Sequence, residues 1–128
     1  CLPDAPKDAE GRLTVVGDGT QHWPTVHVDD VADLYALIVE RPAPAGRVLA
    51  LSGQNPTVAE IGEAFAGGPV VPEGPDASRT RLGAGYADAL MLDQQGSGAK
   101  ARALGWSPSR ASLLDEIRSG RYAATADE

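Results

Sequence analysis

The sequence predicts a single α/β domain with about three short strands and four helices. Short apolar or β-branched runs at residues 13–16, 25–28 and 47–51 have the composition of strands. Segments with apolar residues at helical spacing follow the second and third of these runs. Fifteen glycines and ten prolines in 128 residues require many turns, so each element is expected to be short. A chain of this length fits one ordinary domain.

Changes in amino-acid composition along the chain predict where the domain begins and ends. Residues 1–10 mix Pro, Asp and Lys without an apolar period, and we expect a linker or a truncated element there. Residues 11–122 then form the domain, and residues 123–128 form a disordered tail. Residues 72–85 contain many helix breakers and no clear period, so a mobile loop is expected. Because the chain begins with Cys1 rather than Met, we expect a processed, trimmed or fragmentary product.

Four helices are expected, at residues 31–41, 58–66, 97–104 and 109–119. Asp29 or Asp30 can accept hydrogen bonds from the amides of the first helix, and Pro42 ends that helix. Thr57 and Glu60 have the spacing of a capping box at the start of the second helix. These signals fix the starts of the first two helices.

Charge and hydropathy exclude two classes of partner. Eighteen acidic and eleven basic residues give a net charge of −7, which repels a nucleic-acid backbone. No stretch reaches the roughly 18–20 apolar residues of a membrane span, and the start does not resemble a signal peptide. The expectation is therefore a cytoplasmic protein that binds neither nucleic acid nor membrane.

The sequence shows no metal site and no complete catalytic motif. Its two histidines, His22 and His27, lie far from the one cysteine, so metal ligands do not converge. Ser97 lacks the glycine spacing of a nucleophile elbow and is expected to cap a helix. Residues 83–85 read Gly-Ala-Gly, but no strand precedes them and a third glycine is missing, so a dinucleotide loop is rejected. None of the three tyrosines is followed by a lysine four residues later.

Two separated motifs resemble one family. Residues 17–32 read GDGTQHWPTVHVDDVA, and residues 104–108 read Leu-Gly-Trp-Ser-Pro after a helix that bears Lys and Arg. In this order they resemble the C-terminal, substrate-side portion of the extended short-chain dehydrogenase/reductase family, which includes NAD-dependent epimerases and dehydratases. The resemblance spans residues 13–122. It implies a Rossmann-type parent enzyme, of which this chain is the substrate-binding portion.

The resemblance also implies what the chain lacks. Family members hold the Gly-rich cofactor loop and the catalytic Ser/Thr, Tyr and Lys in their N-terminal portion, and none of these is present here. We therefore expect no catalytic residue in this chain, NAD or NADP in the parent enzyme, and no tight cofactor binding by this chain alone. The implied partners are a small-molecule substrate and the missing N-terminal Rossmann portion, and a homo-oligomer is compatible with both. The alternative is a stand-alone, non-enzymatic module that binds a small molecule or a protein.

The resemblance places the loop after Gly17 against the substrate. Asp18, Gln21, His22 and Trp23 are the predicted substrate-binding residues, and His27 and Asp30 are predicted to support them from behind. Nucleotide-sugar members tend to carry an arginine where this chain has Trp23, and an indole cannot make that bidentate phosphate contact. The resemblance therefore favours a small carbonyl or alcohol substrate with apolar or ring character.

Each of these residues also has a structural interpretation, which the sequence leaves open. Asp30 can serve as a helix cap, and Asp18 between two glycines as a turn residue. His27 can be a buried histidine on a strand, while His22 and Trp23 can cover the edge of the core. Trp106, after a helix-ending glycine, is expected to pack on the core.

Overall fold

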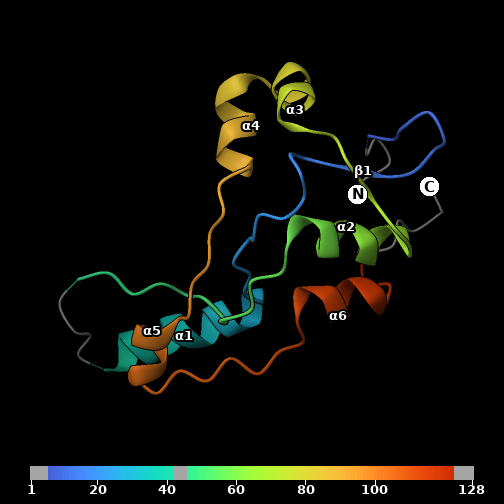
Figure 1. Cartoon of the computed structure of the whole chain (residues 1–128). Coiled ribbons are helices and arrows are strands. Elements are labelled where there is room, and N and C mark those ends of the chain that lie inside the picture. The colour runs from blue at the N-terminus through green and yellow to red at the C-terminus, as the bar shows by residue number, and fades with distance from the viewer. Residues whose placement is uncertain (1–5, 42–45, 123–128) are drawn as a thin grey trace, which may run out of the picture.

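The computed structural model describes residues 6–41 and 46–122, which contain six helices and two short strands (Figure 1). In chain order these elements are β1 (Thr14–Val15), α1 (Val28–Glu40), α2 (Val58–Ala66), β2 (Val71–Pro72), α3 (Pro75–Leu82), α4 (Ala84–Leu90), α5 (Ala99–Ala103) and α6 (Leu113–Arg118). The mixture of helices with a small parallel sheet agrees with the predicted α/β class. The predicted numbers, about three strands and four helices, are wrong for the described residues. Cys1, Pro42 and the predicted tail at 123–128 lie outside them.

β1 and β2 form the sheet. They run parallel, with Thr14 opposite Val71 and Val15 opposite Pro72. The amide of Val71 donates to Leu13 O at 2.9 Å. Val15 is buried in an apolar cluster with Val16 and Val58, so α2 packs on β1. A strand within residues 13–16 is therefore confirmed.

The other two predicted strands are wrong within the described residues. Thr25 makes an isolated antiparallel bridge to Gln54, and α1 already begins at Val28. Residues 47–50 alternate between exposed and half-buried as a strand would, yet no described strand pairs with residues 47–51. A run with strand composition becomes a strand only where a neighbour accepts and donates its backbone hydrogen bonds.

α1 starts three residues earlier than predicted. His27 is the residue before its first turn, and His27 Nδ1 accepts a hydrogen bond from the amide of Asp29 at 3.1 Å. Asp29 and Asp30 therefore lie inside the first turn, and neither is the cap. Their carboxylates still suit the positive end of the helix dipole.

α2 has the predicted bounds and the predicted cap. Thr57 Oγ1 accepts from the amide of Glu60 at 3.1 Å, and Glu60 Oε2 accepts from the amide of Thr57 at 2.8 Å. Gly67 ends the helix with φ of 68°, a conformation that glycine adopts at no steric cost. This capping box is local, which explains why the sequence alone predicted it.

The predicted mobile loop at residues 72–85 is wrong, because α3 and the start of α4 occupy most of it. Pro75 is at the start of α3, where its missing N–H is not needed. Ser78 is fully buried: its hydroxyl donates to Glu73 Oε2 at 2.8 Å and accepts from the amide of Gly17 at 2.9 Å. Arg81 Nε lies 2.6 Å from Glu73 Oε1 and lowers the pKa of that carboxyl. These contacts, not periodicity, hold α3.

The last two helices are shorter than predicted. α5 covers five residues, and its N-cap is Gly98, so the predicted capping role of Ser97 is wrong. Ser97 Oγ accepts from the amide of Ala99 at 3.2 Å just before the helix. Ser112 caps α6 by accepting from the amide of Asp115 at 3.1 Å. Trp106, between these helices, is buried in a second apolar cluster with Leu34 and Ala101, and its predicted packing role is confirmed. None of the helices in residues 6–41 and 46–122 is long and apolar enough to cross a membrane.

Asp30 joins α1 to the segment between α5 and α6. Its side chain is 2% exposed and accepts from the amides of Ser109 at 3.0 Å and Arg110 at 3.2 Å. Its backbone carbonyl accepts from Trp106 Nε1 at 2.7 Å. A buried carboxylate satisfied by backbone amides fixes how this segment crosses α1.

Replacing Asp30 by Asn should destabilise the chain by roughly 1–3 kcal/mol, because the amide NH₂ would face a backbone N–H in a buried position. Urea unfolding followed by circular dichroism measures the change. Asp33→Asn is the matched control: Asp33 is exposed and lies 3.7 Å from Arg110, so its loss should cost less than about 1 kcal/mol. Equal losses in both variants would contradict the role of Asp30.

Candidate functional site

The predicted site lies in residues 17–24, a loop held on one side by the start of α2. Three backbone hydrogen bonds make this join: Ala59 N to Gly19 O at 2.9 Å, Val58 N to Gln21 O at 3.0 Å and Trp23 N to Pro56 O at 3.0 Å. Because the first amides of a helix have no partner inside it, the loop carbonyls satisfy two of them. The loop and α2 therefore stabilise each other.

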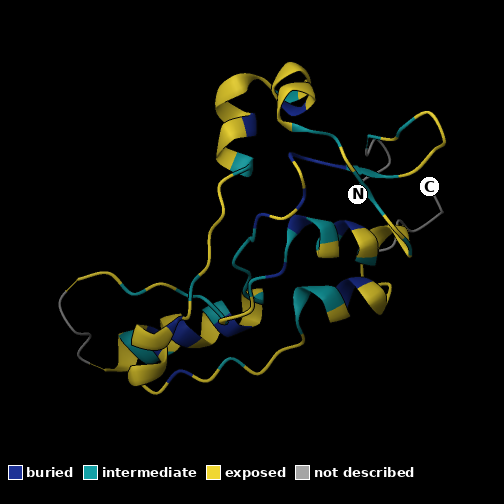
Figure 2. Cartoon of the chain, viewed as in Figure 1, coloured by how far each residue is buried: buried dark blue, intermediate teal, exposed yellow. Residues whose placement is uncertain are grey.

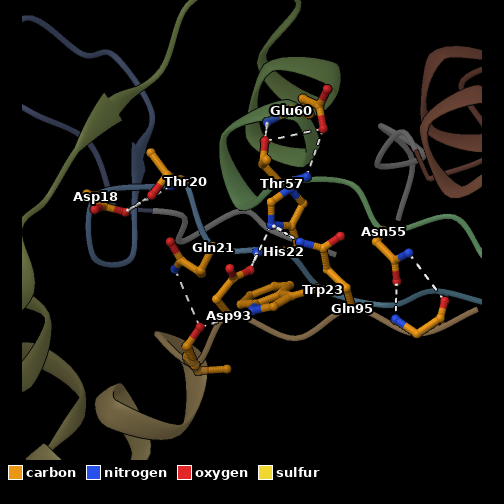
Figure 3. A network of polar contacts seen from close by, with 12 residues as sticks. Asp18, Thr20, Gln21, His22, Trp23, Asn55, Thr57, Glu60, Asp93 and Gln95 are labelled. Carbon is orange, nitrogen blue, oxygen red and sulfur yellow. Dashed lines mark hydrogen bonds and ion pairs between the residues drawn. The ribbon is translucent and has the colours of Figure 1, made fainter.

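The segment after α4 holds the other side of the loop (Figure 3). The amide of Gln94 donates to His22 O at 3.1 Å, and Trp23 Nε1 donates to Leu90 O at 3.0 Å. Asp93 Oδ1 accepts from the amide of His22 at 2.9 Å. The loop thus lies between the start of α2 and the segment after α4, and His22 and Asp93 are 71 residues apart along the chain.

Asp18 forms the tip of the loop between Gly17 and Gly19, whose φ angles are 67° and 80°. Its carboxylate is exposed and accepts from the amide and the hydroxyl of Thr20 at 2.9 and 2.8 Å. The backbone hydrogen bond from Thr20 is the main reason that the pKa of Asp18 is lowered. Asp18 is therefore a turn residue, and its role in binding substrate stays a prediction.

Gln21 is buried, and its side-chain amide is used inside the protein. Nε2 donates to Val16 O at 2.9 Å and lies 3.4 Å from Leu90 O. Gln21 nevertheless borders an open hollow of about 330 Å³ together with Asp18, and four residues outside the loop also line it: Pro75, Arg79, Asp88 and Met91. Two of the predicted substrate-binding residues, Asp18 and Gln21, therefore line this hollow.

The residues of this hollow from α3 and α4 were missed by the sequence interpretation. Arg79 Nε lies 2.7 Å from Asp88 Oδ1 and bridges the two helices. The sequence predicts a mobile loop at residues 72–85, which include Arg79, and it assigns no role to Asp88. Arg79 and Asp88 are nine residues apart in the sequence, and no local pattern indicates that this pair lies next to residues 18–21.

His22 and Asp93 form a second polar pair. His22 Nδ1 lies 2.7 Å from Asp93 Oδ1, and Gln95 Nε2 lies 3.3 Å from the same ring nitrogen. The pKa of Asp93 is lowered, first by the backbone N–H of His22 and then by its ring. The ring of His22 remains partly exposed, so it can meet a solute while the pair keeps its orientation.

Trp23 packs on the core. It contacts the cluster of Val15, Val16 and Val58, and its indole N–H is engaged by Leu90 O. Trp23 therefore covers the edge of the core, as its structural interpretation predicts. Its predicted role as an apolar wall for substrate is not tested by these contacts, because the side chain is only half-buried.

The two predicted supporting residues contact other parts of the chain. His27 caps α1, and Asp30 binds the segment at Ser109 and Arg110. His27 also borders a second hollow of about 440 Å³, together with Val28, Leu113 and Glu116. The structure brings together Asp18, Gln21, His22 and Trp23, and it connects His27 and Asp30 to the α6 side instead.

No group of three or more His, Cys, Asp or Glu residues within the described part of the chain could hold a metal ion. The glycines at residues 83–85 also do not form a dinucleotide-binding loop. Gly83 precedes α4 but follows α3, whereas a phosphate-binding turn joins a strand to a helix. The segment at Gly83 therefore does not form the phosphate-binding turn of a dinucleotide site.

Comparison with known proteins gives one match. The model of the NAD dependent epimerase/dehydratase family matches residues 5–51, which include the loop and α1. No curated protein and no solved structure matches the chain. The family match supports the resemblance seen in the sequence, and that family is NAD(P)-dependent.

The lowered pKa of Asp93 gives a testable pH effect. Because the folded state favours the ionised carboxyl, the pair stabilises the fold above the ordinary aspartate pKa of about 3.9, and this contribution is lost as pH falls through the lowered value. His22→Ala removes the ring but keeps the backbone N–H. The Asp93 titration midpoint, measured by carboxyl ¹³C NMR, should rise yet stay below the ordinary value.

Gln95→Ala is the control for this titration, because it changes a neighbour of the ring and leaves the His22–Asp93 contact in place. Its midpoint should equal that of the unmodified chain. An Asp93 midpoint that does not move in His22→Ala would show that the ring does not contribute.

Proposed function

We propose that this chain is the substrate-side part of an NAD(P)-dependent oxidoreductase or epimerase-like enzyme that acts on a small carbonyl or alcohol compound. Residues 11–122 would form its substrate domain. One observation carries the proposal: the family match at residues 5–51 falls on the segment that contains the doubly held loop. Turnover would need the cofactor-binding part of the same enzyme, because this sequence has no Tyr-x-x-x-Lys.

The loop geometry supports a binding role. A loop already fixed by hydrogen bonds at Gly19, Gln21 and His22 loses little conformational entropy when a ligand arrives. Asp18 can accept and Arg79 can donate hydrogen bonds at the hollow they border. Carbonyl and alcohol groups need donors and acceptors of this kind. In this proposal the chain binds and orients the substrate, and the cofactor supplies the hydride chemistry elsewhere.

The reading frame upstream of codon 1 provides the first test. The proposal predicts an in-frame Gly-rich loop between a strand and a helix, followed by Tyr-x-x-x-Lys. The alternative, a stand-alone module without enzymatic activity, predicts a start codon directly before Cys1. The purified 128-residue chain should also leave the fluorescence of added NADH and NADPH unchanged, and micromolar binding of either would contradict the proposal.

Trp23→Ala tests the predicted apolar wall in the complete enzyme. Loss of the ring should raise KM with little change in kcat, by roughly 1–3 kcal/mol of binding free energy. Steady-state kinetics with the alcohol or carbonyl compound that the enzyme turns over measures this. Trp23→Arg should improve binding of a phosphorylated analogue, because a guanidinium can grip phosphate through two hydrogen bonds.

Because Trp23 also packs on the core, the kinetic result needs a control for folding. Trp23→Phe keeps a smaller aromatic face and removes the N–H that donates to Leu90 O. Its KM should stay near that of the unmodified enzyme. A folded Trp23→Ala enzyme with unchanged kcat/KM would show that Trp23 is a packing residue only.

A further inference from the structure

The hollow beside the loop presents more hydrogen-bond acceptors than donors. Its volume of about 330 Å³ lies at the small end of ligand sites, and its charged lining residues are Asp18, Arg79 and Asp88. A carboxylate only accepts hydrogen bonds, whereas a guanidinium only donates them. The lining therefore has two carboxylates for one guanidinium.

The side-chain oxygen of Gln21 is a further acceptor. Gln21 is 5% exposed, and polar atoms in such a position are normally hydrogen-bonded. Its Nε2 donates to Val16 O at 2.9 Å, but no described residue donates to its Oε1. Gln21 and Asp18 belong to the same loop and line the same hollow (Figure 3). A ligand N–H group in the hollow would supply the donor that Oε1 lacks.

The guanidinium of Arg79 is already paired with two carboxylates. Nε lies 2.7 Å from Asp88 Oδ1, and Nη1 lies 3.2 Å from Asp76 Oδ1. The hydrogen bond to Asp88 is the main reason that the pKa of Arg79 is raised. Asp18 is ionised at neutral pH as well, because the backbone hydrogen bond from Thr20 lowers its pKa. Three carboxylates thus lie around one guanidinium, and the hollow carries a net negative charge.

The surroundings of the hollow do not offset this charge. Glu73 and Arg81, the neighbouring ion pair, cancel each other. The whole chain has a net charge of −7. Figure 2 shows that α3 and α4 are exposed over most of their surface, so these charges face water. A negative field of this kind attracts cations to the hollow and repels anions.

We propose that the substrate of this hollow is a small amino alcohol or amino ketone, whose ammonium group binds Asp18 and Gln21 while its oxygen faces Arg79. This proposal rests on the proposed function, of which it names the substrate class. An ammonium group has three N–H donors, enough for the Asp18 carboxylate and for Gln21 Oε1. Arg79 Nη2 keeps N–H groups that no described acceptor takes, and these can donate to the oxygen. Pro75 and Met91 provide apolar contacts for a short carbon skeleton.

Anions and metal ions are poorer occupants of the hollow. A phosphate or carboxylate group would face Asp18 and Asp88, and Arg79 would offer it only the N–H groups that its two carboxylate partners leave free. A metal ion would meet the positive charge of Arg79. The part of the chain that the structure describes also contains no group of three carboxylate, imidazole or thiol ligands for one. An organic ammonium with a neighbouring oxygen matches both signs of charge.

Isopropanolamine, propylene glycol and lactate test this charge preference, because they share a three-carbon skeleton with a secondary alcohol. At neutral pH the first is a cation, the second is neutral and the third is an anion. Each is titrated into the 128-residue chain, and the amide signals are followed by ¹H–¹⁵N NMR. Isopropanolamine should shift the amides of residues 17–21 and reach saturation, and propylene glycol should bind about tenfold more weakly. Lactate should leave these amides unchanged.

Asp18→Asn separates the hollow from the overall charge of the chain. It keeps an oxygen for Thr20, removes the charge, and should raise the Kd of isopropanolamine about tenfold. Asp33→Asn is the matched control: it removes the same charge from an exposed position on α1, and its Kd should stay within about twofold.

Three results would overturn the proposal: no shift with isopropanolamine, shifts with lactate as large as those with isopropanolamine, or an equal loss of affinity in both variants. The first two come from the unmodified chain and do not depend on a variant folding. The proposed function is decided separately, by the upstream reading frame and by turnover. A complete enzyme that oxidises propylene glycol but not isopropanolamine would keep the proposed function and overturn this substrate class.

Discussion

The backbone hydrogen bonds of residues 17–25 hold the described structure together. The sheet has strands of only two residues, so it cannot organise the chain by itself. The loop instead lies between the start of α2 and the segment after α4, and it bonds to both through Gly19, Gln21 and His22. The predicted site is therefore also the structural centre. The hydrogen bonds that hold the loop are formed in the unliganded chain.

The apolar residues divide into two small clusters on either side of this centre. One contains Val15, Val16 and Val58, and the other contains Leu34, Ala101 and Trp106. Clusters of this size leave little hydrophobic free energy beyond the cost of ordering the chain. Val28, Tyr35 and Val39 of α1 add exposed apolar surface outside these clusters.

The sequence predicted those features whose signal is local. The capping box at Thr57 and Glu60 lies within four residues, and α2 has the predicted bounds. The prediction of a strand at residues 47–51 was wrong, because no strand of the described residues pairs with this segment. The sequence did not predict α3, because the hydrogen bonds of Ser78 that hold it, to Glu73 and Gly17, include one to a distant part of the chain. The loop motif predicted Asp18 and Gln21 of the hollow, whereas Arg79 and Asp88 came close only through folding.

Amide hydrogen exchange of the unliganded chain tests most directly whether the loop is pre-formed. The amides of Trp23, Val58, Ala59 and Gln94 donate to the four carbonyls that hold the loop in place. They should exchange slowly and with similar protection, because one cooperative unit must open to release them. Gly68, which follows α2, is half-buried, but its amide makes no hydrogen bond within the described residues, so it should exchange fast and serves as the reference. Exchange of Trp23 and Gln94 as fast as that of Gly68 would show that the loop is not held, and would contradict the account.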